Sequence, residues 1–248
     1  MKIIIAKNYQ SMSRKAADLI IRQIQMKKNS VLGLATGNTP LGMYKNLVRA
    51  CKKGEVSFKK TTAFNLDEYA GLSENSKNSY HYYMRENFFK HIDIAQKNIF
   101  ILDGAAKNLK KECGNFEKMI KERKGIDLQI LGIGLNDHIG FNEPGSSFKS
   151  KTRPVNLTTA TRKANRKYFS GINEVPKKAL TMGLATIMRA KKIILLASGK
   201  EKAEIIAKAL KGKIKPTVPA SILQKHPDVT VILDKEAAGI ILLPKLVK

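Results

Sequence analysis

The sequence predicts an α/β fold, built as one doubly wound domain with a mostly parallel sheet flanked by helices. Short apolar runs rich in β-branched residues alternate with longer amphipathic segments, a pattern typical of βαβ units. No linker-like or low-complexity segment divides the 248 residues, and the chain has no internal repeat. We therefore expect a single domain over residues 1–248, with its ligand beyond the carboxyl ends of the strands.

Apolar runs and amphipathic stretches alternate from the first residues onward. The helix expected at residues 13–28 has an apolar stripe that includes Ala17, Ile20 and Ile24. Pro40 is well placed in the first turn of the next helix. In chain order, strands are expected at residues 2–6, 31–35, 61–66, 98–102, 127–133, 192–197 and 229–233, and helices at 13–28, 40–52, 80–91, 106–124, 181–188 and 201–210.

The charge is unusual, with 46 lysines and arginines against 20 acidic residues, for a net charge of +26. Clustered cations favour nucleic acids, because binding releases counterions from the phosphates. Here the cations are spread over the chain, and only 6% of residues are aromatic. The sequence therefore favours a solvated basic surface that attracts small anionic substrates over a nucleic-acid interface.

Several other classes of protein are disfavoured. No apolar run approaches the ~20 residues that span a bilayer, so we expect a cytoplasmic protein that does not insert into membranes. Cys51 and Cys113 lie far apart and form no CxxC motif, and the histidines show no metal-ligand spacing. We expect no metal and no organic cofactor.

The first candidate loop follows the strand at residues 31–35. Gly37 permits close backbone approach, the hydroxyls of Thr36 and Thr39 donate hydrogen bonds, and Asn38 precedes a helix with free N–H groups. These features suit a phosphate monoester, although the loop alone is equally compatible with an ordinary strand–helix turn. It is neither a Walker loop nor a GxGxxG motif.

Two further loops follow strands and are expected to converge on the same crevice. Asp67 and Glu68 directly follow the strand at 61–66, and only one of two adjacent side chains faces the crevice. A carboxylate there suits removal of a carbon-bound proton, although an isolated acidic pair is more often a solvated turn. After residues 127–133, His138 lies among glycines and close in sequence to Glu143, which predicts a carboxylate-supported proton shuttle.

At these residues the chain resembles the glucosamine-6-phosphate deaminases. The segments that carry the resemblance occur in family order over nearly the whole chain: Leu34-Ala-Thr-Gly-Asn-Thr-Pro40, Phe64-Asn-Leu-Asp-Glu-Tyr69, Ser79-Tyr80, His138-Ile-Gly-Phe-Asn-Glu-Pro-Gly145, Ser146-Ser147, Thr152-Arg153, Ala179-Leu-Thr-Met-Gly183 and Ser198-Gly-Lys-Glu-Lys-Ala203. The resemblance implies a Rossmann-like fold and conversion of glucosamine 6-phosphate to fructose 6-phosphate and ammonia. Members of the family occur as monomers and as homo-oligomers.

The resemblance also implies roles for individual residues. His138, supported by Glu143, opens the sugar ring, and Asp67 moves a proton from C2 to C1. The phosphate is held by residues 36–39 and Lys202, with help from Lys167, which stands where many members have arginine. Asn136 stands where many members have aspartate, so we expect it to orient rather than carry charge.

Three alternative functions remain open at this level. A deaminase of galactosamine 6-phosphate acts on a sugar that differs in one hydroxyl. A 6-phosphogluconolactonase has a similar histidine loop. A non-catalytic binder of sugar phosphate or RNA is the alternative of another class, and the combination of Asp67, His138 and Glu143 argues against it.

Overall fold

Seven parallel strands form the main sheet of the protein, in a computed structural model that describes residues 1–242. The sheet order is β1-β10-β9-β6-β2-β3-β5, and every neighbouring pair is parallel. The strands are β1 (Lys2–Ala6), β2 (Val31–Leu34), β3 (Thr62–Asn65), β5 (Ile99–Phe100), β6 (Leu128–Leu131), β9 (Lys192–Ala197) and β10 (Val229–Asp234). The prediction of a mostly parallel sheet is confirmed.

The direction in which the chain crosses the sheet changes between β2 and β6. From β2 the chain proceeds to β3 and β5 on one side, whereas from β6 it later proceeds to β9 and β10 on the other. The connections that follow β2 and β6 therefore diverge and open a crevice between them. The fold thus provides a ligand site at the carboxyl ends of these two central strands.

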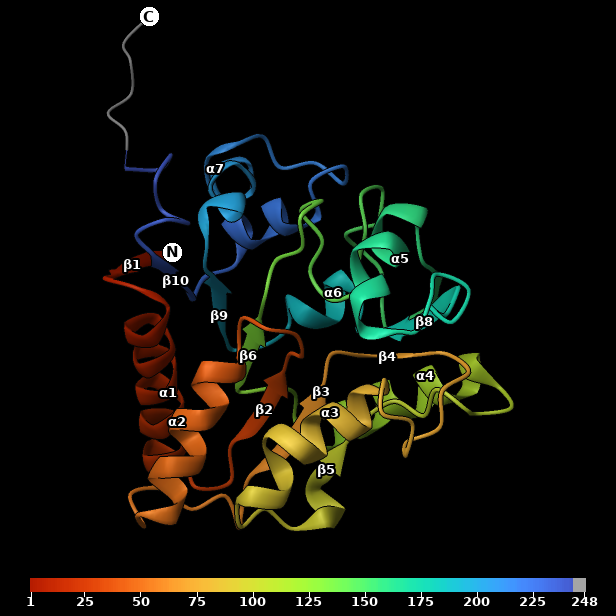
Figure 1. Cartoon of the computed structure of the whole chain (residues 1–248). Coiled ribbons are helices and arrows are strands. Elements are labelled where there is room, and N and C mark those ends of the chain that lie inside the picture. Colours follow the sequence, from red (N-terminus) through yellow and green to blue (C-terminus); the bar gives the residue numbers. More distant parts are fainter. Residues whose placement is uncertain (243–248) are drawn as a thin grey trace, which may run out of the picture.

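Helices cover both faces of the sheet, as Figure 1 shows. One face packs against α1 (Tyr9–Met26), α2 (Leu41–Lys52) and α3 (Tyr80–Asn87), and the other against α4 (Leu109–Glu122), α6 (Leu184–Ile187) and α7 (Ala203–Lys211). Along β9, Ile193 and Leu195 enter one core while Ile194 and Leu196 enter the other. Burial on both faces explains why this strand is a continuous apolar run.

A second, three-stranded antiparallel sheet was not predicted. It has the order β4-β8-β7 and is formed by β4 (Asp67–Tyr69), β8 (Lys178–Thr181) and β7 (Arg153–Asn156). Its strands are short and contain charged residues and a proline, so they lack the apolar runs that indicated the main sheet. The two sheets meet at Leu66, whose N–H donates to Leu34 (2.9 Å) and whose carbonyl accepts from Met182 (2.7 Å).

Several element boundaries differ from the predicted ones. The first helix begins at Tyr9 because Asn8 and Ser11 form a capping box before it. The helix expected at 181–188 was partly wrong, since Thr181 ends β8 and α6 begins only at Leu184. A helix not predicted, α5 (Thr159–Asn165), and five short 3-10 helices complete the fold: Phe89–His91, Gln96–Asn98, Arg166–Tyr168, Lys200–Lys202 and Pro219–Lys225.

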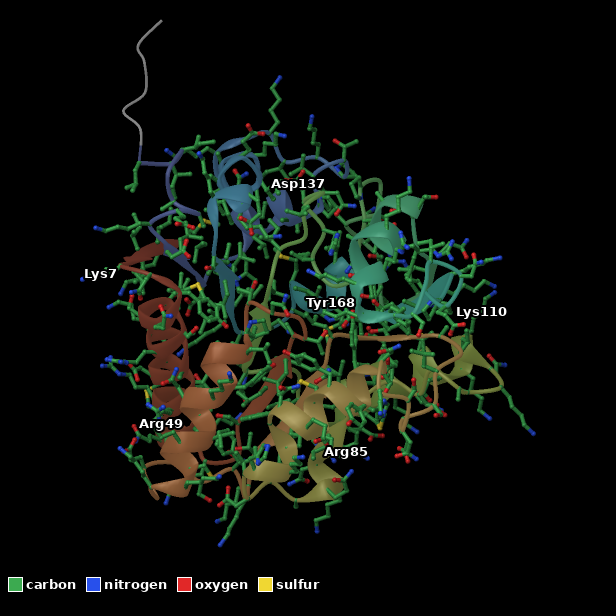
Figure 2. All side chains as sticks on the ribbon, in the orientation of Figure 1. Lys7, Arg49, Arg85, Lys110, Asp137 and Tyr168 are labelled. Atoms are coloured by element: carbon green, nitrogen blue, oxygen red, sulfur yellow. The ribbon has the colours of Figure 1, made fainter. Side chains whose placement is uncertain are left out.

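Side chains that end in nitrogen lie around the outline of the molecule in Figure 2, as the spread of lysines along the sequence predicts. Lys7, Arg49, Arg85 and Lys110, labelled there, come from four separate parts of the chain. Within residues 1–242, none of the helices has the length and apolar character needed to cross a membrane.

Candidate active site

A cavity of about 1110 Å³ opens at the carboxyl ends of the central strands. It is lined by nine of the ten residues singled out from the sequence, namely Thr36, Gly37, Asn38, Thr39, Asp67, Asn136, His138, Lys167 and Lys202. These residues come from five separate stretches of the chain. The parallel sheet brings all of them but Lys167 together, because the other four stretches follow strands that end at one edge.

The loop after β2 is held by two tyrosines that also line the cavity. Gly37 has a φ of 94°, a left-handed conformation that favours glycine. The Tyr83 hydroxyl donates to the Gly37 carbonyl (2.5 Å), and the Tyr9 hydroxyl donates to the Asn38 carbonyl (3.0 Å). Because these carbonyls are occupied, the negative ends of the peptide dipoles in residues 36–39 are neutralised, which favours an anion. The two tyrosines come from separate helices, and no sequence signal indicated them.

Two lysines supply positive charge to the same cavity. The Lys202 ammonium donates to the Ile133 carbonyl at 2.7 Å, which fixes the side chain beside the loop after β6. Burial and the nearby charge of Lys167 lower the pKa of Lys202, against an opposing effect of Glu201. Lys167 lies in a 3-10 turn, with its ammonium 5.1 Å from the centre of the Tyr168 ring. An anion between the two ammonium groups would relieve their mutual repulsion.

Asp67 is a buried carboxylate that faces the cavity, with only 6% of the residue exposed. Burial and the neighbouring charge of Glu68 raise the pKa of Asp67 to about 8. Gly140, at a φ of 56°, packs closely over it, since a Cβ there would lie 3.5 Å from Asp67 Oδ2 and 2.9 Å from Thr181 Oγ1. The structure therefore places a carboxyl group of high proton affinity in a largely dry wall of the cavity.

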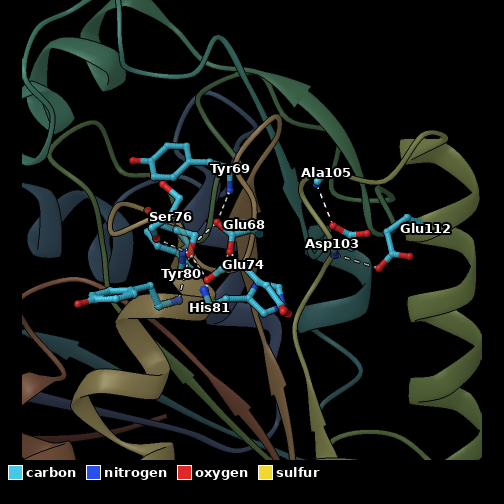
Figure 3. Close-up of polar contacts among 11 residues, drawn as sticks. Glu68, Tyr69, Glu74, Ser76, Tyr80, His81, Asp103, Ala105 and Glu112 are labelled. Atoms are coloured by element: carbon cyan, nitrogen blue, oxygen red, sulfur yellow. Dashed lines mark hydrogen bonds and ion pairs between the residues drawn. The ribbon is translucent and has the colours of Figure 1, made fainter.

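Glu68 points away from the cavity, as the alternation of side chains along a strand requires. Its fully buried carboxylate accepts hydrogen bonds from the backbone N–H groups of Tyr69 (2.8 Å), Tyr80 (2.9 Å) and His81 (2.9 Å), and from His81 Nδ1 (2.9 Å). These bonds converge on one side chain in Figure 3. Glu68 therefore ties β4 to the amino terminus of α3, where the helix dipole favours a negative charge.

His138 lies in the glycine-rich loop after β6, against the backbone of Gly134. A Cβ at Gly134 would lie 2.0 Å from His138 Cε1, so a side chain at this position would displace the ring. The Asn136 side-chain oxygen contacts His138 Nδ1, and an amide oxygen can only accept, so Nδ1 carries the proton. Nε2 is then the basic nitrogen of the ring.

The electrostatic surroundings keep His138 neutral. Burial lowers the pKa of His138 to about 4, with a raising effect of Glu143 and a further lowering effect of Lys202. At neutral pH the ring is an acceptor at Nε2 and a donor at Nδ1. It can therefore take up a proton only transiently, as a shuttle between two substrate oxygens does.

Glu143 is the exception among the predicted residues, because it lies behind the cavity wall. Its carboxylate accepts hydrogen bonds from the Thr158 N–H (3.0 Å), the Thr158 hydroxyl (2.9 Å) and the Thr161 hydroxyl. The expected hydrogen bond between Glu143 and the imidazole is absent among the described residues, and Asn136 takes that place. Proximity in sequence was misleading because the intervening Gly140 turns the chain. Glu143 still acts on His138 through its charge.

An aromatic wall beside Asp67 escaped the sequence analysis. Tyr69, Tyr80, Phe141 and Phe169 line the cavity, and their ring centroids lie 5.0–6.0 Å apart in four pairs. In the sequence, Tyr69 and Tyr80 belong to motifs that carry the family resemblance, which assigns them no role of their own. The four aromatic residues form no recognisable sequence pattern, because they come from different elements.

Asp137, which occupies the turn between Asn136 and His138, adopts a φ of 65° (labelled in Figure 2). The left-handed region is accessible to aspartate at a modest cost, so no glycine is required at this position. The Ala220 N–H donates to the Asp137 carbonyl at 3.2 Å and anchors the turn.

Comparison with known proteins adds independent findings. The sequence model of the family described as glucosamine-6-phosphate isomerases/6-phosphogluconolactonase matches residues 6–232. A Thermoanaerobacter pseudethanolicus protein named glucosamine-6-phosphate deaminase is 56% identical over 241 residues, which cover 97% of this chain and 95% of that protein. A Clostridium novyi protein of the same name is 55% identical over 239 residues, covering 96% of this chain and 99% of the relative.

Two solved structures are also similar. One, described as a monomeric glucosamine-6-phosphate deaminase, superposes with a TM-score of 0.95 at 50% identity and covers 97% of this chain and 100% of its own. A 6-phosphogluconolactonase from Trypanosoma cruzi has a TM-score of 0.78 at 22% identity, covering 98% and 97% of the two chains. The second similarity shows a shared fold alone.

Replacement of Asp67 by asparagine should stabilise the protein, and the gain should grow between pH 5 and pH 8. The folded-state pKa of about 8 exceeds the ~3.9 of an unfolded aspartate. Between these two values Asp67 is protonated in the folded protein and ionised in the unfolded protein, which favours unfolding. The stability that protonated Asp67 provides is complete below ~3.9 and is lost as the pH rises towards 8. Thermal melts of Asp67→Asn at both pH values measure the gain. Asp18→Asn, on the exposed face of α1, is the control. An equal gain for Asp67→Asn at both pH values would contradict the raised pKa of Asp67.

Proposed function

The chain belongs to the family of glucosamine-6-phosphate isomerases and 6-phosphogluconolactonases, and we propose that it is a glucosamine-6-phosphate deaminase. It converts glucosamine 6-phosphate and water to fructose 6-phosphate and ammonia. The observation that carries the proposal is a buried carboxyl group of high pKa, Asp67, in one cavity with an anion-binding loop and a neutral histidine. Removal of a carbon-bound proton requires a strong base of this kind in a dry site.

Asp67 performs the isomerisation in this proposal. As a carboxylate it takes the proton from C2 of the open-chain sugar while the aldehyde oxygen O1 gains a proton from the ammonium group on C2, which gives an enolamine. It then returns its proton to C1. The resulting imine at C2 reacts with water, which replaces the nitrogen and releases ammonia. A protonated amine on C2 would lie beside Asp67 and lower its pKa, so an amino sugar itself promotes ionisation of the base.

His138 opens the pyranose ring before this step. Its basic Nε2 takes the proton from the O1 hydroxyl and delivers it to O5. The imidazole ring is therefore positively charged only briefly. Asn136 holds the tautomer that this transfer requires. Glu143 favours the transient imidazolium through its charge, from behind the wall.

The phosphate group is held at the other end of the cavity. Thr36, Gly37, Asn38 and Thr39 precede α2, and their loop provides N–H groups and hydroxyls for phosphate oxygens. Lys202 and Lys167 neutralise the charge. Lysine serves here as a point charge without the bidentate geometry of arginine.

The alternatives are less well supported. The relatives at 50–56% identity are named glucosamine-6-phosphate deaminases, whereas the T. cruzi lactonase is 22% identical. Hydrolysis of a lactone also needs no base for a carbon-bound proton, which leaves the buried Asp67 without a task. A similar solved structure is described as monomeric, and we propose that this protein acts as a monomer or a homo-oligomer in the cytoplasm.

Ammonia release from a panel of hexosamine 6-phosphates tests the function. We expect turnover of glucosamine 6-phosphate, and a loss of ~10²–10⁴-fold in Asp67→Asn, since that is the typical contribution of a general base. Absence of ammonia release by the unaltered protein would refute the proposal. Near-normal release by Asp67→Asn would refute the assigned base.

Replacement of His138 by glutamine should make ring opening rate-limiting. The deuterium isotope effect on turnover of glucosamine 6-phosphate labelled at C2 should then fall towards one, because proton removal at C2 no longer limits the rate. Glu143→Gln should show the same change more weakly, since its charge acts at a distance. An unchanged isotope effect in His138→Gln would assign the loop a structural role.

Lys202→Ala should raise the KM for glucosamine 6-phosphate by about 10- to 100-fold, which corresponds to loss of a hydrogen bond to a charged group. Lys200→Ala, in the same turn but outside the cavity lining, serves as the matched control. Free glucosamine should bind poorly to all three proteins. Equal binding of glucosamine with and without its phosphate would contradict the phosphate site.

A further inference from the structure

Tyr80 is a cavity-lining side chain to which the proposed chemistry gives no task. It is the first residue of α3, and its ring stacks on Phe141 with a centroid distance of 6.0 Å and an interplanar angle of 7°. Tyr69 packs against it at 5.0 Å and 48°. The two neighbours leave the ring little freedom, so its hydroxyl occupies a fixed position in the cavity wall.

The backbone of Tyr80 is fixed by the same strand that carries Asp67. The Tyr80 N–H donates to Glu68 Oε1 at 2.9 Å, and Glu68 directly follows Asp67 in β4 (Figure 3). Ser79 caps the helix by accepting from the Tyr82 N–H at 3.0 Å. The distance between the Tyr80 side chain and the Asp67 carboxyl group is therefore set by a short and rigid connection.

Tyr80 lines the cavity together with Thr36, in the proposed phosphate loop, and with Asp67. Burial, and next Tyr69 and Asp67, raise the pKa of Tyr80 well above its ordinary value, against a lowering effect of Thr36, so the phenol stays neutral and both donates and accepts.

A six-carbon chain with its phosphate on the loop and its C2 at Asp67 must pass Tyr80. C4 is the hydroxyl-bearing carbon midway between those two ends. We propose that the Tyr80 hydroxyl hydrogen-bonds the hydroxyl on C4 of the substrate, and that it thereby selects the gluco over the galacto configuration. The inference rests on the proposed function, because the positions of phosphate and C2 define the path of the chain.

The configuration at C4 separates glucosamine from galactosamine. A fixed phenol that fits one orientation of this hydroxyl cannot hydrogen-bond the other orientation, so a galacto substrate loses this hydrogen bond to the site. The structure thus supplies a physical basis for a preference that the sequence left open. Tyr80 contacts the substrate in this proposal, whereas Glu68 positions it.

Tyr80→Phe tests the proposal, because it keeps the aromatic stack and removes only the hydroxyl. With glucosamine 6-phosphate we expect kcat/KM for ammonia release to fall about 3- to 10-fold, the loss typical of one hydrogen bond. With the 4-deoxy analogue, the unaltered protein should show a similar loss and Tyr80→Phe no further loss. The preference for glucosamine over galactosamine 6-phosphate should also shrink in Tyr80→Phe.

Tyr82→Phe is the matched control, since Tyr82 lies on the same helix outside the cavity lining, with Arg85 over its ring at 5.1 Å. It should behave as the unaltered protein, and thermal melts check that both variants are folded. The proposal would be overturned if the losses in kcat/KM caused by Tyr80→Phe and by the 4-deoxy substrate multiplied when the two were combined. An unchanged kcat/KM in Tyr80→Phe would also overturn it. Failure of the unaltered protein to release ammonia would instead overturn the proposed function, so the two failures are distinguishable.

Discussion

The parallel alignment of seven strands is the constraint on which the rest of the structure depends. Because neighbouring strands run in one direction, the segments after β2, β3, β6 and β9 all emerge at one edge of the sheet. The change of direction between β2 and β6 separates two of these segments and opens the cavity. Thr36, Asp67, His138 and Lys202 meet for this reason, although Thr36 and Lys202 lie 166 positions apart in the sequence.

The cavity lining contains both positively charged lysines and a buried carboxyl group. Lys167 and Lys202 supply positive charge to the cavity, while Asp67 sits on the small antiparallel sheet, next to an aromatic wall. No cation of the described residues forms a salt bridge with Asp67, so burial and Glu68 determine its proton affinity. Under the proposed function, this buried acid destabilises the fold but is a stronger base than an ion-paired acid would be.

The two adjacent acids of β4 point to opposite sides of the strand and have different surroundings. Asp67 faces the cavity with a high pKa, and Glu68 faces inward with four hydrogen-bond donors around it. Glu68 holds the start of α3 and the Tyr80 ring beside the base. A substitution at Glu68 is therefore expected to disturb both the position and the proton affinity of its neighbour, through different physical routes.

The sequence alone predicts the parallel architecture and a group of residues that share one cavity, because apolar periodicity reports burial and motif residues directly follow strand ends. Nine of the ten selected residues line one cavity for that reason. Only the tertiary structure decided the partners of His138 and Glu143, since Asn136 contacts the ring while Thr158 and Thr161 bind the carboxylate. The small sheet, α5 and the aromatic wall likewise depend on contacts between distant segments. Such contacts leave no periodic signal in the sequence, because hydrogen bonds and ring packing depend on where a backbone turns in space.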